Sequence, residues 1–359
     1  MKVSLYLGKY KGIKVFIHWT FSILLLWIII SNSRSGVAIG DTGWSLLFIL
    51  AIFFCVILHE FGHALTAQKY GIKTKDIILL PIGGLARLEK IPEDPRQELH
   101  VALAGPLVNI VIFFLLSIVV YLKGFNVELV EDTHVDGSTI LLFLASANLF
   151  LALFNLLPAF PMDGGRVLRA LLSLRMPRVK ATQIAGSIGQ FMGISFVFIG
   201  LFYNPILVLI GIFIFLGAQA EITHTTQTSI LKGFSVQDVL MRKFPIIAFD
   251  APLSKAIEKL LDGQSTHFVV VKDDDPIGTI SREEIMRGLK EGNEGTSVEK
   301  VANLNPLNLE VYQPLEEAYK LMSTENKKVA LVYEENLFLG MIDQENISEF
   351  IMVKLALSK

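Results

Sequence analysis

The sequence contains almost no cysteine and unusually little charge. Cys55 is the single cysteine in 359 residues, so the chain can form neither a disulfide framework nor a cysteine-based zinc ribbon. Charged residues make up 18% of the chain, whereas soluble domains carry about 25%, and the mean hydropathy is +0.54. A net charge of -2 argues against a nucleic-acid partner. The composition therefore indicates a membrane protein in contact with lipid.

The few charges are unevenly placed. Residues up to about 222 contain long uncharged runs, and the rest of the chain alternates charged and apolar positions as soluble domains do. We expect a membrane domain at 1–222, a linker at 223–234 and a soluble region with two units, 235–290 and 297–359. The expected fold class is a polytopic α-helical membrane protein with six transmembrane helices, followed by a soluble α/β pair of repeats.

Six apolar stretches approach the roughly 20 residues that a helix needs to cross the hydrocarbon core. They are Val15–Ser31, Trp44–Thr66, Leu99–Leu122, Ile140–Leu157, Ile184–Phe202 and Pro205–Ala220. The first could instead be a cleaved signal peptide, with Ser31 and Ser33 at the cleavage site. Lysine and arginine concentrate at residues 2–14, 69–96 and 166–180, so they occupy every second loop if all six stretches are retained. Because basic loops stay in the cytoplasm, we expect a cell-membrane protein with both termini and the soluble region cytoplasmic.

One apolar stretch carries a cluster of ionisable residues. His59, Glu60 and His63 follow the uncharged run Leu46–Leu58. The two histidines are four residues apart, so they share one helix face and can bind one metal ion, with the glutamate beside them as a general base. Ionisable residues inside a membrane are costly and normally functional. The pattern H-E-x-x-H is that of zinc peptidases; the alternative is a core pair of histidines with a partnered glutamate.

A catalytic zinc site needs a third protein ligand and leaves its fourth position to water. The best candidate is Asp163, because prolines and glycines interrupt the helical pattern around it, between Asn155 and Arg166. The second and fourth expected helices both run towards the cytoplasm, so His63 and Asp163 arrive at the same membrane face. Asp163 could instead cap the helix that follows it.

Three motifs together resemble the site-2 protease family of intramembrane metalloproteases. They are His59-Glu60-x-x-His63, Ala104-Gly105-Pro106-x-x-Asn109, and Asn155 followed by Pro158, Pro161, Asp163 and Gly164. The resemblance implies a zinc endopeptidase whose one catalytic Zn2+ is held by His59, His63 and Asp163, with Glu60 activating the water. It also implies that Asn155 and Pro161 contact the substrate, a transmembrane segment of another protein.

The residues themselves leave three asparagines undecided. Asn155 could donate to the developing oxyanion or hydrogen-bond between helices, and for Asn109 and Asn148 we favour helix packing. The segment Ile77–Glu89 combines β-prone residues with Gly83 and Gly84, which predicts a hairpin with a Gly-Gly turn. The family resemblance implies that the edge of this hairpin, with both glycines, binds the extended substrate; an ordinary interfacial loop is the alternative.

The soluble region repeats itself at an offset of 62 residues, as Pro252 and Leu253 match Pro314 and Leu315. The repeat resembles a pair of CBS domains, modules that often bind adenosine nucleotides. Ser281 and Glu284 approach the ribose-contact pattern of that family and are the candidate contacts for an adenine nucleotide. Asp343 and Asn346, the corresponding residues of the second repeat, depart further from it. The alternative is a pair without ligand that serves assembly, for instance as a homodimer.

Other ionisable or reactive residues lack matching partners. We expect surface or packing roles for His18, His100, His134, His224 and His267, and helix packing rather than metal binding for Cys55. Two other function classes fit an intramembrane cluster: an ion transporter gated by the CBS pair, and an inactive membrane adaptor. The glutamate of H-E-x-x-H favours the enzyme, because transport needs no base at that spacing.

Overall fold

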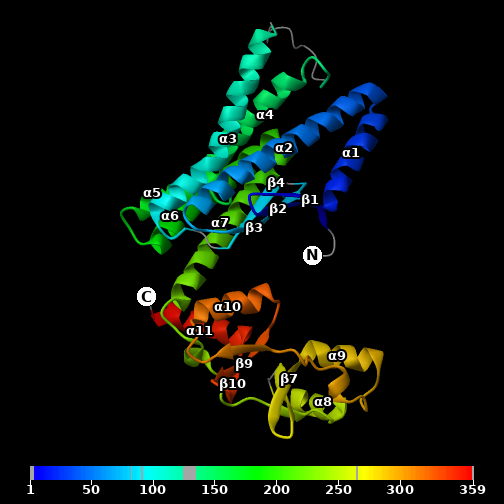
Figure 1. Cartoon of the computed structure of the whole chain (residues 1–359), viewed down its shortest axis with the longest axis vertical. Coiled ribbons are helices and arrows are strands. Elements are labelled where there is room, and N and C mark those ends of the chain that lie inside the picture. The colour runs from blue at the N-terminus through cyan, green and yellow to red at the C-terminus, as the bar shows by residue number, and fades with distance from the viewer. Residues whose placement is uncertain (1–3, 82, 90–91, 124–134, 264–265, 358–359) are drawn as a thin grey trace. The chain divides into compact units, whose positions relative to one another are not determined.

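The fold is taken from a computed structural model (Figure 1), which describes residues 4–81, 83–89, 92–123, 135–263 and 266–357. The chain divides into two compact units, Met1–Thr223 and His224–Lys359. His134 lies outside the described residues.

Long apolar helices dominate the first unit. They are α1 (Thr20–Arg34), α2 (Ile39–Lys69), α3 (Pro95–Leu122), α4 (Ile140–Asn155), α6 (Arg178–Tyr203) and α7 (Pro205–Leu231), with a shorter and more polar α5 (Asp163–Ser173) between α4 and α6. Among the described residues, α2, α3, α6 and α7 are long and apolar enough to cross a membrane, and α1 and α4 are apolar but have only 15 and 16 residues. The first unit is therefore a helical membrane domain with four candidate spans.

A four-stranded sheet accompanies these helices, in the order β1 (Ser4–Tyr10), β2 (Ile13–His18), β3 (Thr74–Leu80) and β4 (Gly83–Leu88). The prediction that the first helix begins at Val15 is wrong, because residues 13–18 form β2. Their alternation buries Ile13 and Val15 against Ala64 of α2 and Ile77 of β3. β2 pairs with β3 in parallel, so the segment before α1 and the segment after α2 belong to one sheet.

The hairpin predicted at Ile77–Glu89 is present as β3 and β4, which pair antiparallel. The Gly-Gly turn is wrong in detail, because Gly83 and Gly84 begin β4 and pair with Leu80 and Leu79. β4 is one of the two edge strands of this sheet. Its edge lies next to α2, the helix that carries the two histidines.

Helix α3 is the central element of the first unit. It begins with Pro95, behind the N-cap Asp94, whose carboxylate accepts hydrogen bonds from the amides of Arg96 and Gln97. It contacts α2, α4 and α5, and Figure 1 shows it running beside α2. The segment from Leu156 to Met162 then folds tightly back into α5. A Cβ on Gly164 would lie 2.2 Å from the carbonyl oxygen of Leu157, so only glycine fits there.

The second unit contains two halves with the same order of elements. The first half has β5 (Ile246–Ala248), α8 (Leu253–Asp262), β6 (His267–Lys272), β7 (Asp275–Ser281) and α9 (Arg282–Glu291), and the second has β8 (Leu307–Glu310), α10 (Leu315–Thr324), β9 (Val329–Glu334), β10 (Leu337–Asp343) and α11 (Gln344–Leu357). Short 3-10 helices, Val236–Val239 and Val298–Lys300, precede them. Each half has its own apolar core, and a third cluster joins Val269 of β6 to Leu331 and Met341 of the second half.

Candidate metal centre

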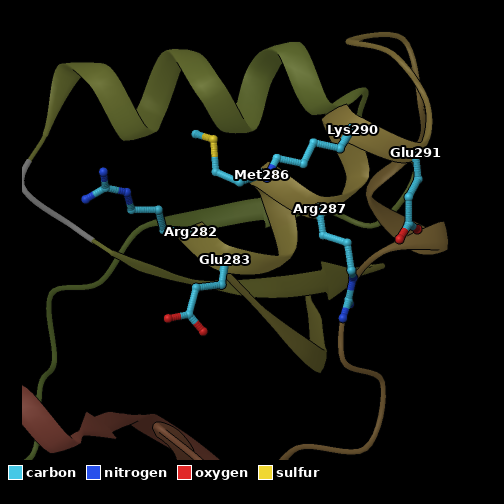
Figure 2. Close-up of a pocket in the computed structure, with 6 residues that line it drawn as sticks. All are labelled: Arg282, Glu283, Met286, Arg287, Lys290 and Glu291. Atoms are coloured by element: carbon cyan, nitrogen blue, oxygen red, sulfur yellow. The ribbon is translucent and has the colours of Figure 1, made fainter.

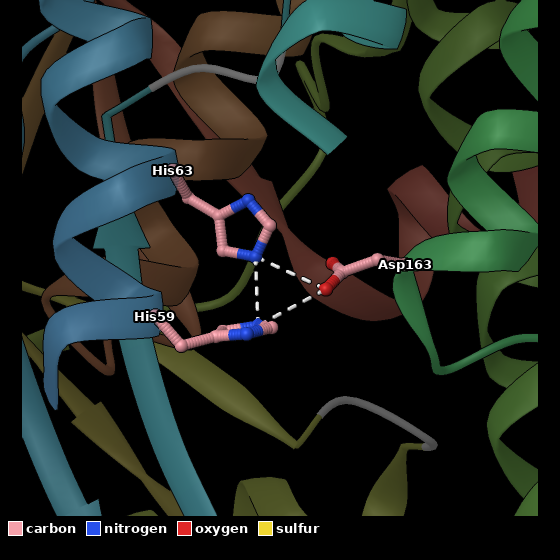
Figure 3. Close-up of side chains that lie close together, drawn as sticks. All are labelled: His59, His63 and Asp163. Atoms are coloured by element: carbon pink, nitrogen blue, oxygen red, sulfur yellow. Dashed lines mark hydrogen bonds and ion pairs between the residues drawn. The ribbon is translucent and has the colours of Figure 1, made fainter. Parts of the chain in front are cut away.

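Two helices bring three potential metal ligands together (Figure 3). His59 and His63 project from α2, one turn apart, and Asp163 is the first residue of α5. Asp163 Oδ2 lies 3.2 Å from His59 Nε2 and 3.0 Å from His63 Nε2, and the two Nε2 atoms are 3.1 Å apart. All three side chains are buried. They form the metal-ligand group found among the described residues, and the residues predicted to converge do converge.

The geometry of this group fits a small divalent ion. Tetrahedral zinc with bonds of 2.0–2.2 Å holds its ligand atoms about 3.3 Å apart, close to the three separations in the structure. Space for the ion is kept by Gly105 of α3, because a Cβ there would lie 2.2 Å from His63 Nε2 and 2.6 Å from His59 Nε2. Two imidazoles and a carboxylate, with no fourth side chain in the part of the chain that the structure describes, match the ligand set of a catalytic rather than a structural zinc site.

The outer nitrogen of each imidazole is held by α3. Asn109 Oδ1 accepts from His59 Nδ1 at 2.5 Å, and the carbonyl oxygen of Val101 accepts from His63 Nδ1 at 2.7 Å. A proton on each Nδ1 leaves both Nε2 lone pairs free for the metal. The Asn109 amide in turn donates to Asn148 Oδ1 at 2.8 Å, and the amide of Asn148 donates to the carbonyl oxygen of Leu144.

Asn109 and Asn148 are hydrogen-bonded to each other between α3 and α4, in keeping with the helix packing favoured for both. The sequence did not predict the further hydrogen bond between Asn109 and His59. Both asparagines are fully buried in apolar helices, and they link α4 through α3 to His59. The signal was the cost of burying an amide without a partner, together with the position of Asn109 in the same motif as Gly105.

Glu60 faces the hairpin. Its Oε2 accepts a hydrogen bond of 3.0 Å from the amide of Ala86 in β4. Gly84, two residues earlier on the same edge, allows this approach, because a Cβ there would lie 2.7 Å from Glu60 Cγ. Glu60 lies on the same helix as His59 and His63. Its carboxylate is held in place by the edge strand β4.

Of the other two candidate substrate residues, Asn155 precedes the turn that leads to Asp163, and Pro161 lies within it. Asn155 ends α4, and its side-chain amide donates to the carbonyl oxygen of Leu151 at 2.9 Å. Pro161 is exposed on one side, and on the other its ring approaches Gly217 of α7, where a Cβ would lie 2.6 Å from Pro161 Cδ. Neither residue joins the metal-ligand group.

The remaining histidines and the cysteine lie outside the metal-ligand group of the described residues. Cys55 is buried and hydrogen-bonded to Asn148. His18 contacts Thr20, and His100 contacts Tyr70. His267 lies 3.9 Å from Asp343 of the second half. Burial lowers the pKa of His267, and the charge of Asp343 opposes this shift.

In the second unit, Ser281 and Glu284 form the capping box of α9. Ser281 Oγ accepts from the Glu284 amide, and Glu284 Oε2 accepts from the Ser281 amide at 2.7 Å and from its hydroxyl at 2.9 Å. Asp343 accepts a hydrogen bond from the backbone amide of Asn346 at the start of α11, whereas the Asn346 side chain donates to the carbonyl oxygen of Val239. Figure 2 shows an open hollow on the adjoining face of α9, lined by Arg282, Glu283, Met286, Arg287, Lys290 and Glu291. This hollow is an exposed helix surface with mixed charge.

Comparisons with known proteins find zinc metalloproteases and CBS domains. A family model described as peptidase family M50 matches residues 47–200, and one described as a CBS domain matches residues 236–291. The zinc metalloprotease MJ0392 of Methanocaldococcus jannaschii is 36% identical over 301 residues, 84% of this chain and 84% of that protein. Stage IV sporulation protein FB of Bacillus subtilis is 32% identical over 160 residues, 44% of this chain and 49% of that protein. Among solved structures, the site-2 protease from M. jannaschii aligns with 38% identity and a TM-score of 0.45, covering 61% of this chain and 94% of that one.

Proposed function

Because the chain belongs to peptidase family M50, the site-2 protease family of zinc metalloproteases, we propose that it hydrolyses peptide bonds in or beside transmembrane segments of membrane proteins. The observation that carries the proposal is the convergence of His59, His63 and Asp163 on a space kept open by Gly105. The family implies zinc, and these residues would hold it. When bound by these residues, zinc would supply a water with a pKa of about 7 and a Lewis acid for the scissile carbonyl.

The chain's own residues do the remaining work. Asn109 and the carbonyl of Val101 keep both imidazoles oriented towards the ion. Glu60 takes the proton of the attacking water and delivers it to the leaving amine. Asn155 has a carbonyl oxygen and a second amide hydrogen beyond its bond to Leu151. We assign that hydrogen to the oxyanion that develops on the substrate.

The edge of β4 would present the substrate. The amide of Ala86 points away from β3, because it bonds to Glu60, so the alternate residues Gly84 and Leu88 direct backbone groups to the same side. A transmembrane helix must be unwound before its peptide bond can reach the ion. An extended segment paired with this edge would have its backbone beside Glu60, which supports substrate contacts at Gly83 and Gly84.

Six membrane crossings are part of the proposal, and two contacts within the first unit support them. β2 precedes α1 and pairs with β3, which follows α2, so a crossing by α2 requires a return crossing by α1. Likewise Glu98, at the start of α3, is ion-paired with Arg169, which follows α4. The 15 and 16 residues of α1 and α4 span about 22–24 Å, which local bilayer thinning can accommodate.

The basic segments then support a topology in which both termini and the CBS pair lie in the cytoplasm. Single cysteines introduced at the two ends of a Cys55→Ala chain test this topology. Both should react with a membrane-impermeant reagent only after the membrane is opened; labelling of either in intact cells would overturn it.

For the second unit we propose that its two halves are a CBS pair that binds an adenine nucleotide near Ser281 and Glu284, or forms a homodimer. The capping box occupies these side chains, so a ribose would have to share the Ser281 hydroxyl. Calorimetric titration of ATP and AMP into the His224–Lys359 unit tests the first half of the proposal. The fragment begins at His224 because Leu231 is buried in the core of this unit. If no heat of binding is measured at millimolar nucleotide, assembly remains as the role of this unit. Sedimentation would then measure whether the unit forms a homodimer.

The decisive experiment on the enzyme uses Glu60→Gln. We expect this variant to retain one zinc ion per chain and to lose cleavage of a labelled membrane substrate, because Glu60 moves a proton and is not a ligand. Asp163→Ala is the matched variant: it should bind zinc much more weakly, through the two histidines alone, and should lose cleavage. Normal turnover by Glu60→Gln would end the assignment of the base, and undiminished zinc in Asp163→Ala would end that of the third ligand.

A further inference from the structure

A buried charge cluster lies beside the metal site and takes no part in the proposed chemistry. Arg169 of α5 is fully buried, and its Nε and Nη2 atoms donate to Glu98 Oε1 of α3 at 2.9 and 2.6 Å. Its Nη1 atom donates to Glu221 of α7. Arg178 of α6 is ion-paired with Glu98 Oε2 at 3.0 Å. Two arginines and two glutamates thus join four helices of the first unit.

Stability alone is a poor explanation for this cluster. Taking charges out of water costs several kcal/mol per ion, and a buried pair is often no better than well-packed apolar residues. Within a membrane domain, ionisable residues are normally functional. We therefore look for a role in which the cluster fixes the positions of the helices and does not simply stabilise the fold.

Arg169 contacts the very segment that delivers Asp163. Its guanidinium lies 5.0 Å from the ring centre of Phe160, in the turn just before α5, and Phe160 is itself buried. α5 begins at Asp163, where a tight turn leaves no cap from a side chain. Arg169 therefore links the turn that precedes Asp163 to the body of the helix that follows it.

Its partner Glu98 stands on the face of α3 that holds the other two ligands. Counting along α3, Glu98, Val101, Gly105 and Asn109 are spaced by three, four and four residues, so they form one stripe on the helix. Val101 holds His63, Gly105 leaves room for the ion, and Asn109 holds His59. Glu98 connects this stripe to α5 through its ion pair with Arg169.

From these contacts we infer that Glu98 and Arg169 are positioning residues for the metal: they lock α5 to α3 so that Asp163 stays within bonding distance of an ion held by His59 and His63. The inference rests on the proposed zinc site. Neither residue touches the ion or the substrate; both act through Asp163. Partners that orient metal ligands are typically worth 10–100-fold in metal affinity.

The test measures zinc affinity of the full chain in detergent by competition with a chromophoric chelator. We expect Arg169→Gln and Glu98→Gln to raise the zinc Kd about 10–100-fold. Arg169→Lys keeps the charge but loses the planar, two-pronged guanidinium, so its zinc Kd should lie between those of the wild type and Arg169→Gln. Arg175→Gln is the control, since Arg175 is exposed just beyond the end of α5, and should bind zinc normally.

The same substitution made in an Asp163→Ala chain distinguishes a positioning role from a general loss of structure. In Asp163→Ala chains, Arg169→Gln should weaken zinc binding no further, because the residue through which it acts is gone. Cobalt in place of zinc gives a ligand-field spectrum, and the Arg169→Gln spectrum should resemble that of Asp163→Ala. Should Arg169→Gln fail to fold, Glu98→Gln and Arg169→Lys carry the same comparison.

Two outcomes overturn the inference: unchanged zinc affinity in the folded single variants, or an equal loss with and without Asp163. A wild-type chain that binds no zinc would instead refute the proposed function, so the two failures are distinguishable.

Discussion

At the scale of single residues, the site depends on what each imidazole does with its second nitrogen. Metal binding uses Nε2 of both histidines, and α3 occupies both Nδ1 atoms, once with a side chain and once with a backbone carbonyl. Only the side-chain contact can be removed by substitution. Asn109 is therefore the position where the orientation of a ligand can be tested directly.

We predict that Asn109→Leu weakens zinc binding about 10–100-fold, because His59 loses the acceptor that fixes its tautomer and ring orientation. Asn109→Asp retains the acceptor and should bind zinc at least as tightly as the wild type. Chelator competition measures both. Equal affinities for the leucine and aspartate variants would show that Asn109 only packs.

Gly105 tests the space for the ion. A methyl group there would lie 2.2 Å from His63 Nε2, which Val101 prevents from turning away. We predict that Gly105→Ala purifies without zinc and without activity, whereas Leu107→Ala, on the exposed side of α3, keeps both. Metal analysis decides this, and a zinc-loaded Gly105→Ala chain would contradict the geometry of the site.

At the scale of elements, the hairpin and α3 approach the site from different sides. α3 contacts the metal ligands, while β4 contacts Glu60. Changes on β4 should therefore affect proton transfer and substrate binding while leaving the metal in place. This separation makes the hairpin a test of how the substrate is presented.

We predict that Gly84→Ala lowers turnover about 100-fold with zinc retained, because its Cβ would displace Glu60, and misplacement by about 1 Å can cost that much. Leu85→Ala, whose side chain is exposed on the same strand, is the control and should leave the position of Glu60 unchanged. Single-turnover cleavage and metal content are measured together. Loss of zinc from Gly84→Ala would mean that the hairpin also supports the ligands.

At the scale of the whole molecule, the chain combines a unit suited to lipid with a unit suited to water. The first unit exposes apolar side chains over its long helices, as a membrane domain must. The second unit has three apolar clusters of its own and charged surfaces such as the outer face of α9. Its stability should respond to pH through His267, whose pKa is lowered by burial.

We predict that the second unit loses stability as the pH falls below about 6.5, the ordinary histidine pKa. Above that pH, His267 is neutral in both the folded and unfolded states. Below it the unfolded chain binds a proton that the folded unit resists, so the free energy of unfolding decreases until the pH passes the lower, folded pKa. Limited proteolysis at rising urea concentrations, from pH 7 to pH 5, measures the effect in the full chain. His267→Asn should flatten the dependence, and an unchanged slope would assign it to other groups.

The sequence alone determined the family, the membrane and soluble halves and the residues that converge. These follow from local quantities: runs without charge, a four-residue histidine spacing, and prolines and glycines that break a helix beside Asp163. The hairpin was also predictable, since its β-prone residues are contiguous, although its turn was misplaced because Gly83 and Gly84 serve the close approach of Glu60 instead.

Only the tertiary structure decided what surrounds the ligands. The start of the first helix was wrong because β2 is stabilised by a strand some 60 residues later, and no local pattern reports such a partner. Asn109 and Arg169 look like an isolated amide and an ordinary basic residue until α2, α3 and α5 come together. Their roles arise from partners 50 and 71 residues away, since a buried polar group acquires its function from the atom it faces, and that atom is chosen by the packing of helices.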